Sequence, residues 1–186
     1  HAPLTPLIIW TGSMSEDIAV ECMKAGAANY ILKENIKRLG PAVVHALEER
    51  QLLLERRQAE EKYQAIFENS AEGIFQSAPD GHYLSVNPAM ARIYGYDSPA
   101  DMIASVTDIA RQIYVEPADQ KDFRRLLAEH GILKDYEQKN YRRDGSVIWT
   151  STSARVVRDA AGKILYYEGF LQDITARRQM EESLKE

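Results

Sequence analysis

Three short turn sequences, each ending in glycine, constrain the fold of this chain more than any other feature. They are Pro79-Asp80-Gly81, Arg143-Asp144-Gly145 and Ala160-Ala161-Gly162. The turns separate stretches of strand-forming residues: 73–78, 82–86, 137–141, 147–157 and 164–171. Strand-forming stretches on either side of such a turn are typical of antiparallel hairpins. Apolar residues at helical spacing fill most of 88–131. The pattern predicts an α+β domain with a five-stranded antiparallel sheet and helices on one face.

The stretch before residue 48 has a different character, since it holds only two of the sixteen aromatic residues. Residues 7–10 and 29–32 are short apolar runs of the kind found in buried strands. Between them we expect a helix whose apolar face is formed by Ile18, Cys22 and Met23. A second helix is expected from about residue 35. This order predicts an α/β unit with a parallel sheet, whose other strands we expect before His1, so that the chain is a fragment.

Residues 48–62 predict a solvated helix, because nine of these fifteen positions are charged and none is Gly or Pro. Val44, Leu47 and Leu54 fall on a repeat of about 3.5 residues. Three of the seven positions of that repeat are polar or charged, so a weak two-helix seam and a plain exposed connector are open alternatives. The predicted division is an α/β unit at 1–47, a helical connector at 48–62, an α+β domain at 63–175 and the start of an output helix at 176–186.

Charge and composition exclude several classes of protein. The 186 residues carry a net charge of −5, which argues against nucleic-acid binding and against attraction to anionic membranes. With 45% hydrophobic and 27% charged residues, the chain is able to form a core. Its longest apolar runs fall far short of the roughly 18 residues of a membrane-spanning helix. Cys22 is the single cysteine, so an internal disulfide is excluded and a cytoplasmic location is expected.

A series of motifs follows in a specific order from residue 63 to residue 175. They are Glu68-Asn69-Ser70, Glu72-Gly73-Ile74-Phe75, Asp80-Gly81, Asn87-Pro88, Gly95-Tyr96, Arg143-Asp144-Gly145, Trp149, Gly169 and Asp173-Ile174-Thr175. In this order and spacing the stretch resembles a PAS domain. The resemblance implies that Asp173, Ile174 and Thr175 end the sheet and lead into an output helix. Asp173 and Thr175 are expected to cap that helix and to fix its direction.

Thr11 ends the first predicted strand and Lys33 follows the second, with Ala25-Gly26-Ala27 and Tyr30 between them. These positions resemble the C-terminal half of a two-component receiver domain, which has a flavodoxin-like α/β fold. The resemblance implies that Thr11 and Lys33 contact a phosphoryl group and that Tyr30 moves with the hydroxyl. Glu34 stands where a proline commonly follows the lysine. The acceptor aspartate and its acidic partners belong to earlier strands of that family, so this chain is expected to hold only remnants of the site.

Alternation along residues 148–156 places one set of side chains on the inner face of the sheet and Trp149 on its outer face. An outward aromatic of this kind often marks a partner contact. Leu165 and Gly169 of the last strand are expected to face inward. The candidate pocket residues are Phe75, Met90, Ile93, Tyr94, Phe123, Thr150, Thr152, Tyr167 and Leu171. The same residues describe an ordinary packed core, so a site for a small apolar ligand and a core without a ligand are both open.

Cofactors and catalysis are not expected. Flavin-binding PAS proteins use a cysteine within the helices and a glutamine at the position of Leu171, and neither is present. Haem needs an imidazole aimed into the pocket, whereas His82 follows a turn and His130 precedes Gly131 at a predicted helix end. The sequence contains no Gly-x-Ser-x-Gly motif and no clustered metal ligands. We therefore expect neither an enzyme nor a metal site in this chain.

The combined resemblance predicts a signalling relay. Receiver phosphorylation, or a ligand or partner at the PAS domain, is expected to reorient the helix that leads to an effector in the same protein. A histidine kinase is the preferred effector and a diguanylate cyclase the alternative, while a haem- or flavin-loaded gas or redox sensor is the rival of another class. A homodimer is expected, built on the connector helix and the outer face of the sheet around Trp149, with no nucleic-acid or membrane partner.

Overall fold

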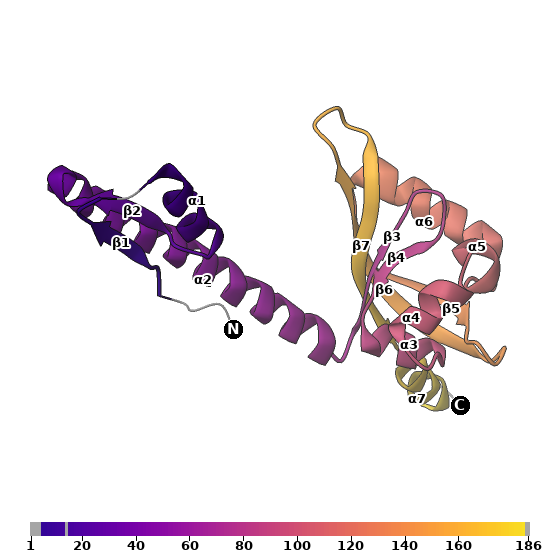
Figure 1. Ribbon diagram of the computed structural model, residues 1–186. Coiled ribbons are helices and arrows are strands. Elements are labelled where there is room, and N and C mark those ends of the chain that lie inside the picture. The colour runs from indigo at the N-terminus through magenta and orange to yellow at the C-terminus, as the bar shows by residue number, and fades with distance from the viewer. Residues whose placement is uncertain (1–4, 14, 185–186) are drawn as a thin grey trace. The chain divides into compact units, whose positions relative to one another are not determined.

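The computed structural model describes residues 5–13 and 15–184 and divides into two compact units between Gln64 and Ala65 (Figure 1). The first unit contains a strand, a helix and a second strand, followed by a short 3₁₀ helix and a long α-helix. The second unit contains five strands, four helices on the sheet and a helix at the end of the last strand.

The first unit is a βαβ arrangement. Its elements are β1 (Ile8–Thr11), α1 (Glu16–Lys24), β2 (Asn29–Leu32) and η1 (Lys33–Arg38). The two strands pair in parallel, from Ile8 with Asn29 to Thr11 with Leu32, which confirms the predicted parallel sheet. Ala19, Ala27, Ile31 and Ala46 are its buried apolar residues among those described.

The predicted apolar face of α1 is only partly correct. Ile18 is 52% exposed and Met23 is 44% exposed, while Cys22 is half-buried. The buried residue of this helix is Ala19. A sheet of two strands offers a narrow apolar surface, which explains why α1 buries one small side chain while Ile18 and Met23 remain exposed to solvent.

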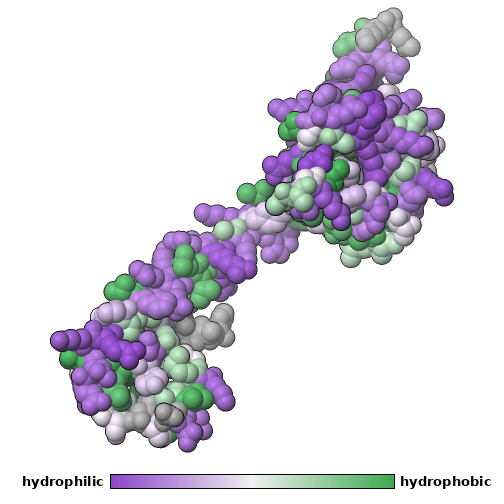
Figure 2. Space-filling view, turned by 90° about the horizontal axis from the view of Figure 1, so that it is seen from above, coloured by the Kyte–Doolittle hydropathy of each residue, from purple (hydrophilic) through white to green (hydrophobic). Residues whose placement is uncertain are grey.

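Helix α2 (Leu39–Asn69) is a single helix of 31 residues, and the predicted connector 48–62 lies inside it. No Gly or Pro follows Pro41 within the helix, which explains its continuity into the second unit. Arg56 pairs with Glu60 and Arg57 with Glu61, one turn apart on the exposed surface. Figure 2 shows hydrophobic patches among these polar side chains, and Leu52 and Leu53 are both about two-thirds exposed. Within the described residues, neither α2 nor any other helix joins enough apolar residues to span a bilayer.

The second unit has the predicted five-stranded antiparallel sheet. Its strands are β3 (Gly73–Ser77), β4 (Tyr83–Val86), β5 (Ile132–Tyr141), β6 (Val147–Arg158) and β7 (Ile164–Asp173). They lie in the order β4-β3-β7-β6-β5. The predicted helical middle forms α3 (Pro88–Tyr94), α4 (Pro99–Ser105), α5 (Ile109–Gln112) and α6 (Pro117–His130). Figure 1 shows these helices gathered on one face of the sheet. A last helix, α7 (Thr175–Ser183), begins where β7 ends.

Side-chain caps fix where the first three of these helices begin. Asn87, Ser98 and Asp108 each accept a hydrogen bond from a backbone N–H in the first turn of α3, α4 and α5, respectively. These residue types are favoured N-caps because their oxygen satisfies an N–H group that has no partner within the helix. Proline follows directly in α3 and α4, where its fixed φ suits the first helical position.

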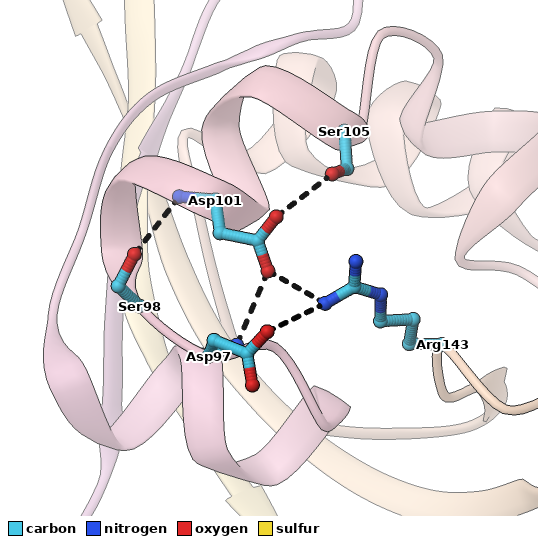
Figure 3. A network of polar contacts seen from close by, with 5 residues as sticks. All are labelled: Asp97, Ser98, Asp101, Ser105 and Arg143. Carbon is cyan, nitrogen blue, oxygen red and sulfur yellow. Dashed lines mark hydrogen bonds and ion pairs between the residues drawn. The ribbon is translucent and has the colours of Figure 1, made fainter.

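Arg143 ties this helical layer to the turn between β5 and β6 (Figure 3). Its Nη1 atom donates to Asp101 Oδ2 at 2.7 Å and to Asp97 Oδ2 at 3.3 Å. Its backbone N–H donates to Tyr94 O at 2.9 Å, and its guanidinium lies 5.3 Å from the centre of the Tyr96 ring. The ion pairs are partly exposed, so each contributes little alone, but together they orient the turn against α4.

The inner face of β6 follows the predicted alternation, since Ile148, Thr150, Thr152 and Ala154 are all buried. The expectation for Leu165 is wrong, because this side chain is 47% exposed. The β6–β7 register shifts after Val157, which pairs with Tyr166, whereas Arg158 pairs with Ile164. Leu165 is therefore the extra residue of a bulge and points away from the core. Gly169 does lie at the inner face, where a Cβ atom would overlap the backbone of Ser153 and Ala154.

Candidate functional site

A cavity of about 40 Å³ lies between the inner face of the sheet and the helices of the second unit. Seven of the predicted pocket residues line it: Phe75, Met90, Tyr94, Phe123, Thr152, Tyr167 and Leu171. Ile93 is half-buried and packs against the core without lining the cavity. Thr150 is fully buried, but its hydroxyl contacts Asn140 Oδ1 and the Gln138 carbonyl, away from the cavity.

Sequence reasoning missed eight lining residues: Ser77, Tyr83, Ile109, Ile113, Tyr114, Gln120, Arg124 and Gln138. Helical spacing would have indicated Gln120, which lies three residues before Phe123, and then Arg124, which lies four residues after Gln120. Gln138 lies on the buried side of β5, two residues before the buried Asn140. The periodicity of apolar residues indicates which face of a helix or strand is buried, and it does not identify polar residues such as Gln120 and Gln138 on that face.

Two buried polar atoms of the cavity wall have no hydrogen-bond partner among the described residues. They are Gln138 Oε1 and Thr152 Oγ1. Gln138 is 5% exposed and Thr152 is 2% exposed. In the β5–β6 register Gln138 faces Thr150 and Tyr136 faces Thr152, so Gln138 and Thr152 are diagonal neighbours on adjacent strands. A polar group buried without a partner is costly, which makes these two atoms the natural contact points for a ligand.

Three of the tyrosines that line the cavity, Tyr83, Tyr94 and Tyr114, are neutral phenols. Burial raises the pKa of Tyr83 and of Tyr94 well above the ordinary value. Burial also raises the pKa of Tyr114, although a hydrogen bond with the Gln138 side chain lowers it in part. These hydroxyls therefore keep their protons near neutral pH and bring no negative charge to the site.

Arg124 is the single charged side chain among the described residues that line the cavity. Its guanidinium donates to the carbonyl of Pro79 at 2.8 Å and to that of Ala78 at 3.4 Å. It also lies 5.6 Å from the centre of the Tyr167 ring. Two of its N–H groups are thus held by backbone acceptors. The described wall of the cavity offers no carboxylate that would attract a cation.

The wall of the cavity carries no catalytic or metal-binding constellation within the described residues. His82 Nδ1 lies 2.6 Å from Asp80 in the turn between β3 and β4, and His130 is exposed at the end of α6. Neither histidine lines the cavity, and Cys22 belongs to the first unit. No group of three or more metal-ligating side chains occurs in the described parts of the chain. The described wall of the cavity therefore supplies neither an imidazole for a haem iron nor a cysteine for a flavin adduct.

The predicted signal exit forms a second candidate site, at the start of α7. Asp173 Oδ1 accepts the Thr175 N–H at 2.9 Å, and Asp173 Oδ2 accepts a hydrogen bond from Arg142 at 2.7 Å. Burial alone would raise the pKa of Asp173, but the Thr175 hydrogen bonds and Arg142 outweigh it and hold the pKa below its usual value. Ile174 is buried and donates its N–H to Trp149 O at 2.9 Å.

Thr175 does not cap α7 as predicted. Its hydroxyl accepts the backbone N–H of Trp149 at 3.0 Å, and the described contacts include no side-chain hydrogen bond at the N-cap, Ile174. The backbone of Trp149 is therefore held by both Ile174 and Thr175, at the start of α7. The physical reason is that the pairing of β6 with β7 continues as far as Asp173, which places the Trp149 N–H beside the Thr175 hydroxyl. The hydroxyl accepts from this N–H and not from an N–H group of α7.

Trp149 is on the outer face as predicted, but it is half-buried beneath cations of its own chain. The Arg178 guanidinium lies 4.8 Å from the centre of its ring, and Lys139 Nζ lies 5.2 Å from it. Glu137 on β5 binds both Arg177 and Arg178. Sequence reasoning missed Glu137, because forty residues separate it from Arg177 and no local pattern joins them.

The predicted phosphoryl-contact residues lie at one edge of the first sheet. Thr11 on β1 is paired with Leu32 on the parallel strand β2, and Lys33 is the residue directly after Leu32. The Thr11 hydroxyl donates to Ser13 O at 2.9 Å, and Lys33 Nζ lies 5.5 Å from the centre of the Trp10 ring. Tyr30 is 40% exposed. The structure thus brings Thr11 and Lys33 to the same edge.

Comparisons with known proteins concern mainly the second unit. A family model described as PAS domain matches residues 71–176. The sensor histidine kinase TmoS of Ectopseudomonas mendocina is 25% identical over 132 residues, which cover 69% of this chain and 13% of that protein. The probable diguanylate cyclase DgcE of Escherichia coli K12 is 24% identical over 129 residues, which cover 67% of this chain and 11% of that protein. The matched segment is thus a small part of each of these relatives.

A solved structure agrees with this match at the level of the fold. The crystal structure of the PAS domain of a Colwellia psychrerythraea protein superposes with a TM-score of 0.54 at 17% identity. The superposition covers 63% of this chain and 98% of the other. The five-stranded antiparallel sheet with helices on one face is therefore an architecture already seen by experiment.

Proposed function

Because this chain belongs to the PAS domain family, we propose that it is a sensory module of a two-component signalling protein. A small molecule or a partner bound at the PAS unit changes the orientation of α7, and α7 passes this change to an effector. The chain itself acts in the cytoplasm and without catalysis. Its similarity to a sensor histidine kinase and to a probable diguanylate cyclase supports a role in signalling.

The observation that carries this proposal is the short path from the cavity to the start of α7. Thr152 and Leu171 both line the cavity and are register partners on β6 and β7. Two residues along the same pair of strands, Thr150 faces Asp173. A displacement of these strands at the cavity therefore moves the residue that holds the first turn of α7.

We infer that the effector is a histidine kinase in the same polypeptide, with a diguanylate cyclase as the alternative. In either case α7 is the first part of the helix that enters the effector. Its attachment through Glu137, Arg177 and Arg178 is ionic and partly exposed, and such a contact is released at low cost. A helix held this weakly suits a two-state output.

Residues 1–47 are assigned in this proposal to the C-terminal half of a receiver domain. The support is the position of Thr11 and Lys33 after adjacent parallel strands, where a hydroxyl and a cation would meet a phosphoryl group. Tyr30 is the switch aromatic of this assignment. The acceptor carboxylate belongs to the earlier part of an intact receiver, so phosphorylation is not expected on this chain.

The proposal includes a homodimer and excludes a bound haem or flavin. Exposed Leu47 and half-buried Leu54 lie seven residues apart on α2, and with exposed Phe170 on the outer face of the sheet they supply apolar contact area for a second copy. The absence of a histidine from the described cavity wall supports a PAS unit without haem. The cavity of about 40 Å³ also lies far below the roughly 300–1,000 Å³ of ordinary ligand sites.

Asp173→Asn in the full-length protein tests the relay. The substitution removes the charge that pairs with Arg142 and keeps the size of the side chain. Asp159→Asn is the matched control, since Asp159 accepts two backbone N–H groups in the turn between β6 and β7, at the far end of β7 from α7. We expect faster amide exchange in α7 and a changed basal effector output for Asp173→Asn alone. An unchanged output from a folded Asp173→Asn protein with a loosened α7 would refute the relay.

A further inference from the structure

The cavity of the PAS unit presents two polar atoms that lack partners among the described residues and belong to diagonal neighbours on adjacent strands of its wall. Gln138 Oε1 is an acceptor, and Thr152 Oγ1 can both donate and accept. Both side chains are more than nine-tenths buried, on adjacent antiparallel strands. A single hydroxyl group placed between these atoms would satisfy both, because it would donate one hydrogen bond to the amide oxygen and accept one from the threonine.

The charges of the wall favour an uncharged ligand. A carboxylate would be attracted by Arg124, but this guanidinium already donates to the carbonyls of Pro79 and Ala78. A carboxylate placed against the Gln138 amide oxygen would be repelled by it. An ammonium group would meet Arg124 and, among the described lining residues, no carboxylate. Tyr83, Tyr94 and Tyr114 also line the wall, and burial keeps these phenols protonated. A neutral group that both donates and accepts is therefore the complement of this wall.

The size and the apolar part of the wall limit the rest of the ligand. One water needs a cavity of about 10–15 Å³, so a cavity of about 40 Å³ has space for a hydroxyl and one or two carbon atoms. The side chains of Phe75, Met90, Phe123 and Leu171 form much of the remaining wall. A second water would meet mostly these side chains, whereas a methyl or ethyl group is compatible with them.

We propose that the PAS cavity binds a short-chain aliphatic alcohol, with its hydroxyl between Gln138 and Thr152 and its alkyl group toward Phe75, Met90 and Leu171. The proposal rests on the proposed sensory function and names the chemical class of its signal. The bound alcohol contacts the part of the wall that β6 and β7 form, and these two strands lead to Asp173 and α7.

Ethanol and acetonitrile are the matched probes, since each has three non-hydrogen atoms but acetonitrile cannot donate to Gln138. The best efficiency known for very small ligands corresponds to a Kd of about 0.5 mM for three such atoms, so we expect millimolar binding of ethanol. The measurement is a titration of the ¹⁵N-labelled chain, in which amide shifts of cavity residues and of α7 are followed together. Ethanol is expected to bind at least about tenfold more tightly than acetonitrile, the cost of one unmade hydrogen bond to a buried group.

Thr152→Val and Thr150→Val form the test pair, because they remove the same hydroxyl from the same face of β6. Thr152→Val is expected to weaken ethanol binding by roughly three- to tenfold with no loss of stability, since it removes an atom that lacks a partner among the described residues. Thr150→Val is expected to lower stability and to leave ethanol affinity unchanged, because that hydroxyl is bound to Asn140 outside the cavity. If Thr152→Val fails to fold, Gln138→Met measures the other half of the contact.

Equal affinity for ethanol and acetonitrile would overturn the assignment of a hydroxyl site, and the lack of any saturable shift at the cavity would overturn the proposal altogether, leaving water as the occupant. Ethanol binding that shifts cavity residues but not α7 supports the ligand assignment and counts against the proposed relay. The relay is judged separately by Asp173→Asn, so the two ideas fail by different results.

Discussion

Asn87 is the side chain whose loss should cost this fold the most. It is fully buried, and it makes four hydrogen bonds to the backbone of three different elements. Its Oδ1 atom accepts the N–H groups of Ile74 and Met90, both at 2.9 Å. Its Nδ2 atom donates to the carbonyls of Phe67 at 3.0 Å and Glu72 at 2.9 Å. One side chain thus joins the end of α2, the start of β3 and the first turn of α3.

The magnitude follows from these four contacts. Loss of the N-cap of α3 costs about 0.5–2 kcal/mol. Each of the other three hydrogen bonds contributes about 0.5–1.5 kcal/mol. An alanine side chain cannot form any of them, so the backbone groups that bind Asn87 would lose this hydrogen-bond partner. Asn87→Ala is therefore expected to lower the free energy of unfolding by roughly 2–6 kcal/mol, a large part of the roughly 5–15 kcal/mol of an ordinary domain.

Asn87→Asp separates the cap from the tie to α2. The aspartate keeps an acceptor for Ile74 and Met90, but its second oxygen faces the carbonyls of Phe67 and Glu72, to which it cannot donate at neutral pH. We expect a large loss of stability and faster amide exchange at the carboxyl end of α2. If capping alone mattered, this variant would be as stable as the wild type.

Urea unfolding measures both variants, followed by Trp149 fluorescence in a Trp10→Phe background so that the PAS unit is observed alone. Ser98→Ala is the control, because Ser98 caps α4 with one side-chain hydrogen bond, to the N–H of Asp101 in the same helix. Its expected cost is about 1 kcal/mol. The reasoning is refuted if Asn87→Ala costs no more than Ser98→Ala, or if Asn87→Asp retains full stability.

Four further outcomes are expected. The pKa of Asp173 is lower in the folded protein than in the unfolded chain, so its carboxylate stabilises the fold above its unfolded pKa of about 4. This stabilisation is lost as pH falls through the folded pKa, so below about pH 4 the wild type should lose stability more steeply than Asp173→Asn. Parallel curves of unfolding free energy against pH for the two proteins would contradict this. Acetyl phosphate should leave the chain unlabelled, and an acid-labile aspartyl phosphate would disprove the half-receiver assignment. The purified chain should be colourless, so a Soret band or a flavin spectrum after gel filtration would overturn the cofactor proposal. Sedimentation at tens of micromolar should show a dimer for the wild type and a monomer for the Leu47→Glu, Leu54→Glu double variant. If the wild type is a monomer and the double variant sediments identically, α2 is a solvent-exposed connector and not a dimer contact.

The sequence was informative where a local pattern and the fold agree. Turn chemistry placed the hairpins, and the strict alternation of β6 correctly predicted that Thr150 and Thr152 are buried. The same rule failed at Leu165, because a bulge inserts one residue and reverses the alternation beyond it. A bulge at this position leaves no signature in the apolar pattern.

Contacts between distant segments account for the rest of what the sequence did not predict. Glu137 meets Arg177 and Arg178 only because β5 and α7 are brought together by the sheet. The side chains of Gln120 and Gln138 line the cavity although this residue type is mostly exposed in proteins. Long-range pairing and buried polar groups are decided by the packed fold, and a single sequence records neither.

The position of the β6–β7 bulge bears on how the proposed relay works. From Thr150 opposite Asp173 to Val157 opposite Tyr166 the two strands pair without a break, and the irregularity comes only at Arg158. The cavity residues Thr152, Leu171 and Tyr167 all lie on the regular part, which ends at α7. Backbone hydrogen bonds couple the strands along this part, so a ligand that pushes on Thr152 or Leu171 moves both strands together toward the Asp173 junction. The bulge lies at the end of the β6–β7 pair that is farther from α7. The irregular pairing there therefore does not interrupt the coupling between the cavity and Asp173.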